Sequence, residues 1–313
     1  MSGPNAADAA TYRDFQARGG VIDLSDRAQL LLTGPDRVRY LNGQVTSDVR
    51  KLQTGQTQMA CVTTAKGKLC ADVVITAHED VLFVDAEGSL RETLLARLER
   101  YIVADDVEIR DVSEEYALLH YVGTEPPPAA AVAGRIVPAR RFGRDGWDLR
   151  ILRADLDKDR AAFFQAGVEV DSELAEVLRI EAGVPRWGYE LDENTLPPEA
   201  GLDQTHIDYH KGCYIGQEVI SRLRSVGHVN RQLTGFVAQG EEPLAPGTRL
   251  FASAGDTASI GLLTSAAYSF ALEKPIALGY LKRGSPTGAL LARPDEANGP
   301  DAVVTARPLP FAP

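Results

Sequence analysis

The sequence predicts an α+β fold followed by a small β-rich unit. The chain has 313 residues, which exceeds the usual size of a single core and suggests about two domains. Its first two thirds mix strand-like runs with a few helical ones. After Arg231 only short strand-like runs remain, cut by Gly and Pro, and we expect a β-barrel or sandwich there.

The first part begins with a strand at 29–33 and a helix in which Pro35 takes the first position. We expect a second helix over 89–102, because Ser89 and Glu92 form a capping box and leucines recur on one face. Alternation and β-branched residues predict three strands between these helices, at 59–64, 70–76 and 81–85.

A proline run at 126–128 predicts a linker near 124–134. A hairpin of two strands, 135–141 and 147–153, follows. The next helix is expected over 172–182, with Asp171 as its N-cap and Gly183 at its end. Runs of strands followed by helices favour α+β over a regular βαβ alternation.

We therefore divide the chain into residues 1–230 and a C-terminal domain of residues 231–313. The C-terminal strands are expected at 233–239, 248–252, 258–265, 276–281, 289–292 and 302–307.

Composition and charge narrow the function classes. Hydrophobic residues make up 44% and charged residues 25% of the chain, which is typical of a folded globular protein. The net charge of −11 disfavours direct binding to nucleic acid or to an anionic membrane surface. No apolar run is long enough to span a bilayer. Three widely spaced cysteines make no disulfide framework, and we expect a reducing, cytoplasmic location.

Several common signatures are absent from the sequence. It contains no phosphate-binding GxxxxGK[ST] loop, no GxGxxG fingerprint, no HExxH helix and no GxSxG elbow. Nucleotide hydrolysis, dinucleotide redox chemistry and the commonest hydrolase mechanisms are therefore disfavoured.

The segment Lys211–Glu218, KGCYIGQE, is the most distinctive. Its two glycines permit sharp turns, and a lysine near Cys213 favours the thiolate, which makes this cysteine a candidate nucleophile or ligand. A buried, inert cysteine is the alternative. His206, His210 and Cys213 would share one face of a continuous helix, but Gly212 argues against that helix and against a dedicated metal site.

A basic run adjoins this segment. Residues 211–231 contain four Lys or Arg and one acid, Glu218, in an otherwise acidic chain. Arg222 and Arg224 suit a carboxylate or a phosphate, although scattered arginines more often face solvent. Upstream, Glu181 ends a predicted helix, where the helix dipole disfavours a carboxylate. Such a carboxylate can pair with an amino-pyrimidine edge.

These segments resemble the YgfZ-type tetrahydrofolate-binding proteins, relatives of the glycine cleavage system T protein, an aminomethyltransferase. Lys211–Glu218 carries the resemblance most specifically. Further similar segments, in the same order, are Leu32–Arg37, Leu41–Gly43, Arg179–Gly183, Pro197–Leu202, Thr234–Phe236 and Ile276–Tyr280.

The resemblance implies a cloverleaf of two interwoven α+β subdomains around a central channel, with a C-terminal β-barrel. It implies tetrahydrofolate as cofactor, with Glu181 on the pterin ring. Cys213 matches the signature cysteine. Asp72 falls where the T protein has its catalytic aspartate, although Gly67-Lys68 and Ala71-Asp72 replace paired glycines and paired aspartates.

Three functions follow as hypotheses. The first is a folate-binding accessory factor for iron–sulfur cluster assembly or repair and for iron–sulfur enzymes, including tRNA-modifying ones. Lys211, Tyr214, Arg222 and Arg224 then join Glu181 in cofactor binding, and Cys213 acts near the channel mouth. The second is a folate-dependent aminomethyltransferase that uses Asp72. The third, a nucleic-acid-binding module, is disfavoured by the net charge.

Overall fold

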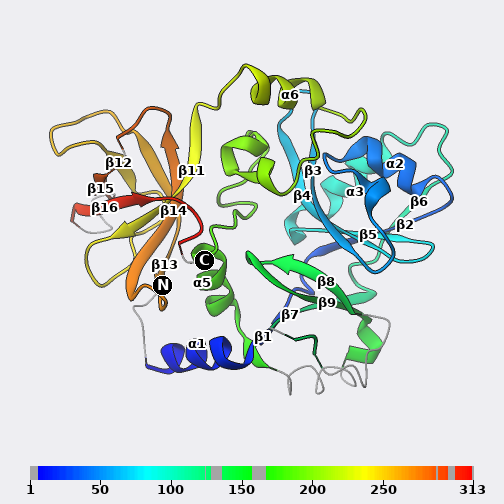
Figure 1. Ribbon diagram of the computed structural model, residues 1–313, viewed down its shortest axis with the longest axis horizontal. Helices are drawn as coiled ribbons and strands as arrows, with labels where there is room; N and C mark the ends of the chain where they lie inside the picture. Colours follow the sequence, from blue (N-terminus) through cyan, green and yellow to red (C-terminus); the bar gives the residue numbers. More distant parts are fainter. Residues whose placement is uncertain are drawn as a thin grey trace.

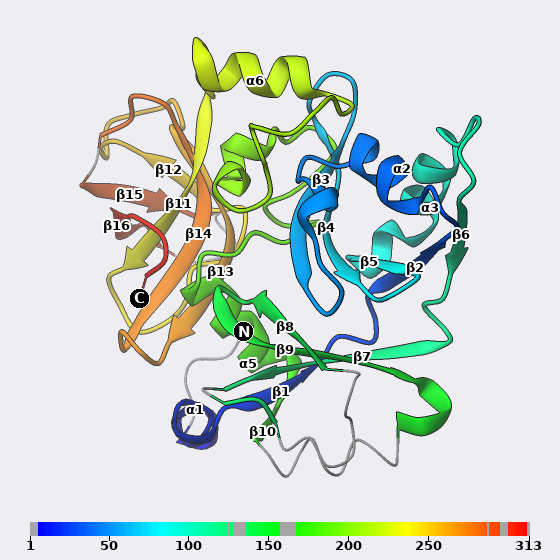
Figure 2. The ribbon, with the colours of Figure 1, turned by 45° about the vertical axis from the view of Figure 1, so that its right-hand side comes forward.

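The computed structural model describes residues 6–123, 125–127, 136–156, 167–286, 288–294 and 300–311. The linker predicted near 124–134 lies mostly outside these residues. Two five-stranded sheets and a closed barrel make up the fold. Figures 1 and 2 show the barrel on one side and the sheet with β3, β4 and β5 on the other, with the second sheet below. The expected α+β class with a C-terminal barrel is confirmed.

The first sheet has the strand order β3-β4-β5-β2-β6 and is antiparallel throughout. Leu30, Leu32 and Val84 belong to its fully buried core, against which Leu94 and Leu98 of α3 pack. The elements are β2 (Ala28–Thr33), α2 (Arg37–Gln44), β3 (Thr57–Thr63), β4 (Leu69–Ala77), β5 (Leu82–Ala86), α3 (Arg91–Glu99) and β6 (Glu108–Asp111).

The second sheet has the order β10-β1-β7-β9-β8, and β1 pairs in parallel with β10. Its first strand precedes the whole of the first sheet in the chain and its other strands follow it, so the two subdomains are interwoven. The elements are α1 (Ala6–Arg18), β1 (Gly20–Asp23), β7 (Tyr116–Val122), β8 (Ile136–Arg141), β9 (Arg144–Leu152), β10 (Val168–Val170) and α5 (Ser172–Glu181).

The barrel closes in the order β11-β14-β13-β12-β15-β16. All six strands were expected, because Gly and Pro punctuate each one. Phe236, Leu250 and Leu263 are completely buried in its core. The strands are β11 (Arg231–Ala238), β12 (Arg249–Phe251), β13 (Gly261–Ser269), β14 (Lys274–Lys282), β15 (Ala289–Arg293) and β16 (Ala302–Arg307).

Some local expectations were wrong. The capping box at Ser89 does not form, because a short 3₁₀ helix, Gly88–Leu90, precedes α3, and α3 starts at Arg91 without a side-chain cap. A helix that the sequence analysis missed, α6 (Gln217–Ser225), occupies part of the basic run. In Figure 2 it lies at the top of the molecule, between the barrel and the first sheet. No helix in the described ranges is long and apolar enough to cross a membrane.

Candidate functional site

A cavity of about 1530 Å³ lies where the two sheets, α5 and the barrel meet. Its walls come from segments far apart in the sequence, which only the fold brings together. Both candidate carboxylates, Asp72 and Glu181, line it. Other parts of the lining are Asp23 and Arg27, Met59, Val74, the β8–β9 turn at 140–144, residues 182–187, 200–202, 204–206 and 306–310.

Glu181 is buried at the last position of α5, with 3% of its surface exposed. The Tyr12 hydroxyl donates to its Oε2 at 2.9 Å. The Ser269 hydroxyl donates to Oε1 at 2.7 Å, and the Ala271 N–H lies 3.4 Å from the same atom. Since an ionised carboxylate offers about four acceptor positions, these three donors leave it room for one further donor.

Tyr12, which holds the candidate carboxylate Glu181, is a residue that sequence analysis missed. It lies on α1, where no apolar block or family motif marks it. Its hydroxyl is buried against Glu181, and burial, reinforced by the Glu181 charge, raises the pKa of Tyr12 to about 12. Tyr12 therefore stays a hydrogen-bond donor at neutral pH and fixes the position of Glu181.

Asp72 lies on β4 and faces the same cavity. Its Oδ1 is buried and has no hydrogen-bond partner in the described part of the chain. Burial raises the pKa of Asp72, against the opposing effect of Arg27. A cavity-facing carboxyl with a raised pKa can hold or accept a proton near neutral pH more readily than an exposed one.

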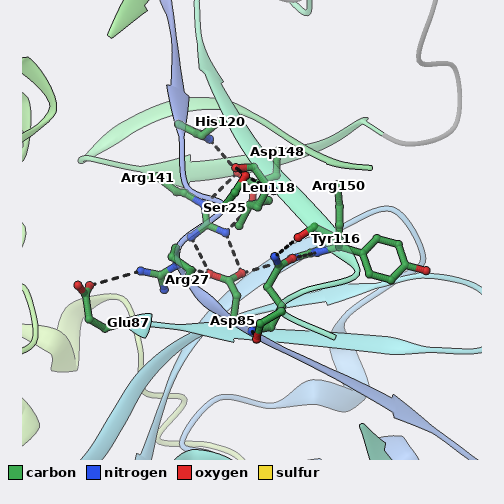
Figure 3. Close-up of polar contacts among 12 residues, drawn as sticks. Ser25, Arg27, Asp85, Glu87, Tyr116, Leu118, His120, Arg141, Asp148 and Arg150 are labelled. Carbon is green, nitrogen blue, oxygen red and sulfur yellow. Dashed lines mark hydrogen bonds and ion pairs between the residues drawn. The ribbon is translucent and has the colours of Figure 1, made fainter. Parts of the chain in front are cut away.

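Behind the cavity wall, a buried ionic network joins the two sheets (Figure 3). Arg141 of β8 donates to Asp85 of β5 at 2.8 and 3.0 Å and to Asp148 of β9 at 2.7 Å. His120 of β7 bonds to Asp148 through Nδ1 at 2.8 Å. Burial opposes the ionisation of both aspartates, but Arg141 outweighs it and lowers their pKa values.

The network reaches the cavity through Arg27 and Arg141, which line it. The Arg27 Nε donates to Asp85 at 2.6 Å. One residue of the first sheet, Asp85, thus receives donors from the β1–β2 connection and from the second sheet. This arrangement fixes the cavity wall that lies beside Asp72.

A second buried network holds α5 against the barrel. The Arg179 guanidinium donates to Glu190 at 2.9 Å and to the Ser265 hydroxyl of β13 at 2.8 Å. Glu190 in turn accepts from Ser265 at 2.5 Å and from Thr264 at 2.7 Å. Because Arg179 and Glu181 share one helix, these bonds also fix Glu181.

The KGCYIGQE segment lies outside the cavity lining, and most of its residues make structural contacts that hold the loop in place. The buried Lys211 ammonium donates to the carbonyl oxygens of Asn42, Val45 and Ser47 at 2.6–2.7 Å. Burial lowers the pKa of Lys211 to about 8, so it remains charged at pH 7. Its three donors are all used within the protein.

Two further residues of the segment are fixed by close packing. Tyr214 is buried beneath the Lys211 ammonium, which lies 5.2 Å from its ring centroid. Gly216 has φ +91°, and a Cβ there would lie 2.5 Å from the Thr64 carbonyl oxygen. Residues 211–216 are therefore held both at the connection between α2 and β3 and at the turn that follows β3.

Cys213 differs from its neighbours because its side chain is exposed. His206, His210 and Cys213 lie in an irregular stretch rather than on one helix. Their spacing therefore does not place them on a common helix face. Cys61 is buried and Cys70 partly buried in the first sheet.

The basic run does not form one anion site. Arg222 and Arg224 are exposed on α6, and Arg224 stacks on Tyr209 at 3.9 Å. Arg231 instead pairs with Glu199 at 3.0 Å and covers the Tyr280 ring. Of the predicted site residues, the structure brings Glu181 and Asp72 to the cavity, whereas Lys211, Cys213, Tyr214, Arg222 and Arg224 lie elsewhere.

The fold and the cavity define a three-part α+β protein whose two sheets and barrel enclose one large site. Family models agree with this architecture: the GCVT N-terminal domain matches residues 5–142, and the glycine cleavage T-protein C-terminal barrel domain matches residues 231–308. Together they match more than half of the chain. The chain belongs to the glycine cleavage T-protein family, and the predicted resemblance is confirmed.

Relatives of two kinds are similar to the chain. An aminomethyltransferase of Rubrobacter xylanophilus is 28% identical over 96% of this chain and 83% of its own length. The tRNA-modifying protein YgfZ of Cronobacter sakazakii is 29% identical over 72% of this chain and 74% of its own length.

A solved structure shows the same fold. The glycine cleavage system aminomethyltransferase T of Bartonella henselae matches with a TM-score of 0.84 over 97% of this chain and 89% of its own, at 18% identity.

Proposed function

We propose that this protein binds a reduced folate, tetrahydrofolate, in the central cavity and acts as an accessory factor for iron–sulfur proteins, including tRNA-modifying ones. The main observation behind this proposal is that Glu181 places a buried carboxylate on the cavity wall, where Tyr12 and Ser269 fix its position. Its remaining acceptor capacity suits the amino-pyrimidine edge of a pterin. Similarity to proteins named as tRNA-modifying supports the accessory role.

The residues present fit such a ligand. A cavity of about 1530 Å³ exceeds the size of most small-molecule sites, so it can hold an extended, partly aromatic cofactor. Apolar walls come from Met59, Val74 and Trp187, and Glu181 supplies the polar orientation. A bound folate would supply one-carbon and redox chemistry; the protein's own groups bind it and limit its exposure to water.

Substitution of Glu181 tests the binding site. We expect Glu181→Gln to weaken tetrahydrofolate binding about tenfold or more, because the substitution removes a charge-assisted hydrogen bond. Anaerobic calorimetric titration measures the affinity. Glu173→Gln is the matched control, since Glu173 is exposed on the same helix and lies outside the cavity lining. Equal affinities for wild type and a folded Glu181→Gln protein would remove the assigned contact.

The accessory role is tested separately at Cys213. In cells that lack this protein, Cys213→Ala should fail to restore the activity of iron–sulfur enzymes, while Ser225→Ala, a substitution at an exposed position of α6, should restore it. Full restoration by Cys213→Ala would remove the thiol from the mechanism. In the accessory role, the exposed arginines of α6, Arg222 and Arg224, are available to bind a partner protein or the anionic tail of the cofactor.

A second candidate is a folate-dependent aminomethyltransferase. Two observations favour it: the Rubrobacter aminomethyltransferase aligns with 96% of the chain, and Asp72 faces the same cavity with an unpartnered Oδ1. Asp72 would accept or donate a proton at the aminomethyl nitrogen. Ammonia release from an aminomethyl-lipoyl carrier in the presence of tetrahydrofolate separates the two functions. If this protein shows no turnover under conditions in which an authentic T protein is active, the aminomethyltransferase function is excluded.

A further inference from the structure

The segment that follows the last barrel strand forms part of the cavity wall. Arg307 ends β16, and Pro308, Leu309 and Pro310 line the cavity after it. We call residues 307–311 the strap. It brings apolar surface to a site whose other walls come from the sheets and from α5.

The strap is attached to the residue that carries the candidate ligand contact. The backbone N–H of Phe311 donates to the carbonyl oxygen of Glu181 at 3.0 Å. Glu181 therefore holds the strap with its backbone, while its carboxylate lies between Tyr12 and Ser269. The strap and the candidate ligand contact therefore meet at one residue.

Two glycines make the seat of the strap. A Cβ at Gly183 would lie 2.8 Å from the Leu309 Cβ. A Cβ at Gly235 would lie 2.7 Å from the Phe311 ring and 2.8 Å from Leu309. Gly183 follows α5 and Gly235 lies on β11, so the seat joins the helix to the barrel. Leu309 and Phe311 pack there against the core that α5 shares with β13 and β14.

Two features of the strap favour its opening. Two of the five strap residues are prolines, which offer no N–H for a hydrogen bond. Pro308 and Pro310 are exposed, and Leu309 and Phe311 are only partly buried. Segments with few backbone hydrogen bonds and partial burial open at a low free energy compared with core elements.

We propose that the strap is a closing element of the ligand site, which seats over a bound reduced folate and slows its release. This inference rests on the proposed function and adds to it the element that controls ligand residence. A ligand in the cavity contacts Pro308, Leu309 and Pro310 only while the strap is seated, so binding and closure favour each other.

The test compares strap variants with a matched leucine elsewhere on the barrel. Stopped-flow dissociation of 5-formyltetrahydrofolate, a stable reduced folate, is measured for wild type, Leu309→Ala, Phe311→Ala and the control Leu262→Ala. Leu262 is exposed on β13 and lies outside the cavity lining. We expect dissociation about tenfold faster in each strap variant, with a smaller change in the association rate and no change in the control.

Hydrogen exchange supplies a readout in the unmodified protein. Bound ligand should slow exchange of the Phe311 amide, because contact with the ligand holds the strap in the position in which this amide donates to Glu181. Wild-type binding combined with unchanged dissociation in both folded strap variants and unchanged Phe311 exchange would overturn the strap proposal alone. If the wild type does not bind the folate at all, the proposed function fails and the strap proposal fails with it.

Discussion

At the scale of single residues, the KGCYIGQE segment separates structural residues from an exposed thiol. Lys211 holds three carbonyl oxygens, Tyr214 is buried and Gly216 is required by its backbone conformation and close contacts. Cys213 is exposed beside them. The fold thus fixes the loop and presents the thiol, and this arrangement would leave the thiol free for chemistry.

Substitutions should separate these two roles. Lys211→Met should lower the free energy of unfolding by about 3 kcal/mol or more, because it leaves buried carbonyl oxygens without donors. Cys213→Ala should change it by less than about 0.5 kcal/mol, as is usual for exposed positions. Urea denaturation at pH 7 measures both. A Lys211→Met protein as stable as wild type would show that the three bonds are dispensable.

At the scale of elements, local patterns predicted the barrel strands well, missed β1, β6, β7 and β10 of the two sheets, and placed the helix boundaries less well. All six barrel strands follow from short apolar runs between Gly and Pro. The cap of α5 also formed as expected, with the Asp171 side chain accepting from the Leu174 N–H at 2.8 Å. These features depend on neighbours in the sequence, which is why a single sequence contains them.

The failures at this scale have tertiary causes. Ser89 has a good capping sequence, but residues 88–90 form a tight 3₁₀ turn instead. Helix α6 was overlooked because its charged residues suggested a solvated loop. Its start depends on Gly216, whose positive φ and contact with Thr64 are set by the first sheet. Neither feature can be seen in the local sequence.

The cap of α5 gives a prediction for a whole element. Asp171→Ala should destabilise the protein by about 1 kcal/mol, because the Leu174 N–H loses its acceptor. Glu173→Ala, at an exposed position of the same turn, should have a much smaller effect. Thermal unfolding of the two variants compares them directly, and equal melting temperatures would contradict a role for the cap.

At the scale of the whole molecule, the candidate site was only partly predictable. Glu181 was identified from its position at the end of a predicted helix and from the family resemblance, and Asp72 from the resemblance alone. Tyr12, which holds Glu181, and the strap lie near opposite ends of the sequence. The network of Asp85, His120, Arg141 and Asp148 also joins distant residues. Only the interwoven topology of the two sheets brings such residues together.

This buried network should make the contact between the two sheets less stable at acidic pH. His120 is completely buried, and burial lowers its pKa despite the opposing effect of Asp148; Arg141 also lowers it, and Asp85 raises it. His120 is therefore neutral in the folded protein, whereas the unfolded chain binds a proton near pH 6.5. Below that pH, unfolding takes up a proton at His120. The contribution of neutral His120 to the free energy of unfolding is therefore present above about pH 6.5 and is lost as the pH falls below it.

Replacement of His120 should reduce this acid sensitivity. One proton taken up on unfolding changes the free energy of unfolding by at most about 1.4 kcal/mol per pH unit. His120→Gln retains a donor for Asp148 but does not titrate, so its stability should fall less steeply between pH 7 and pH 5.5. Urea denaturation across this range measures the slope, with His210→Gln, at an exposed position, as control. If His120→Gln and the wild type show equal slopes, the acid sensitivity arises elsewhere, because the buried network would then take up no proton on unfolding.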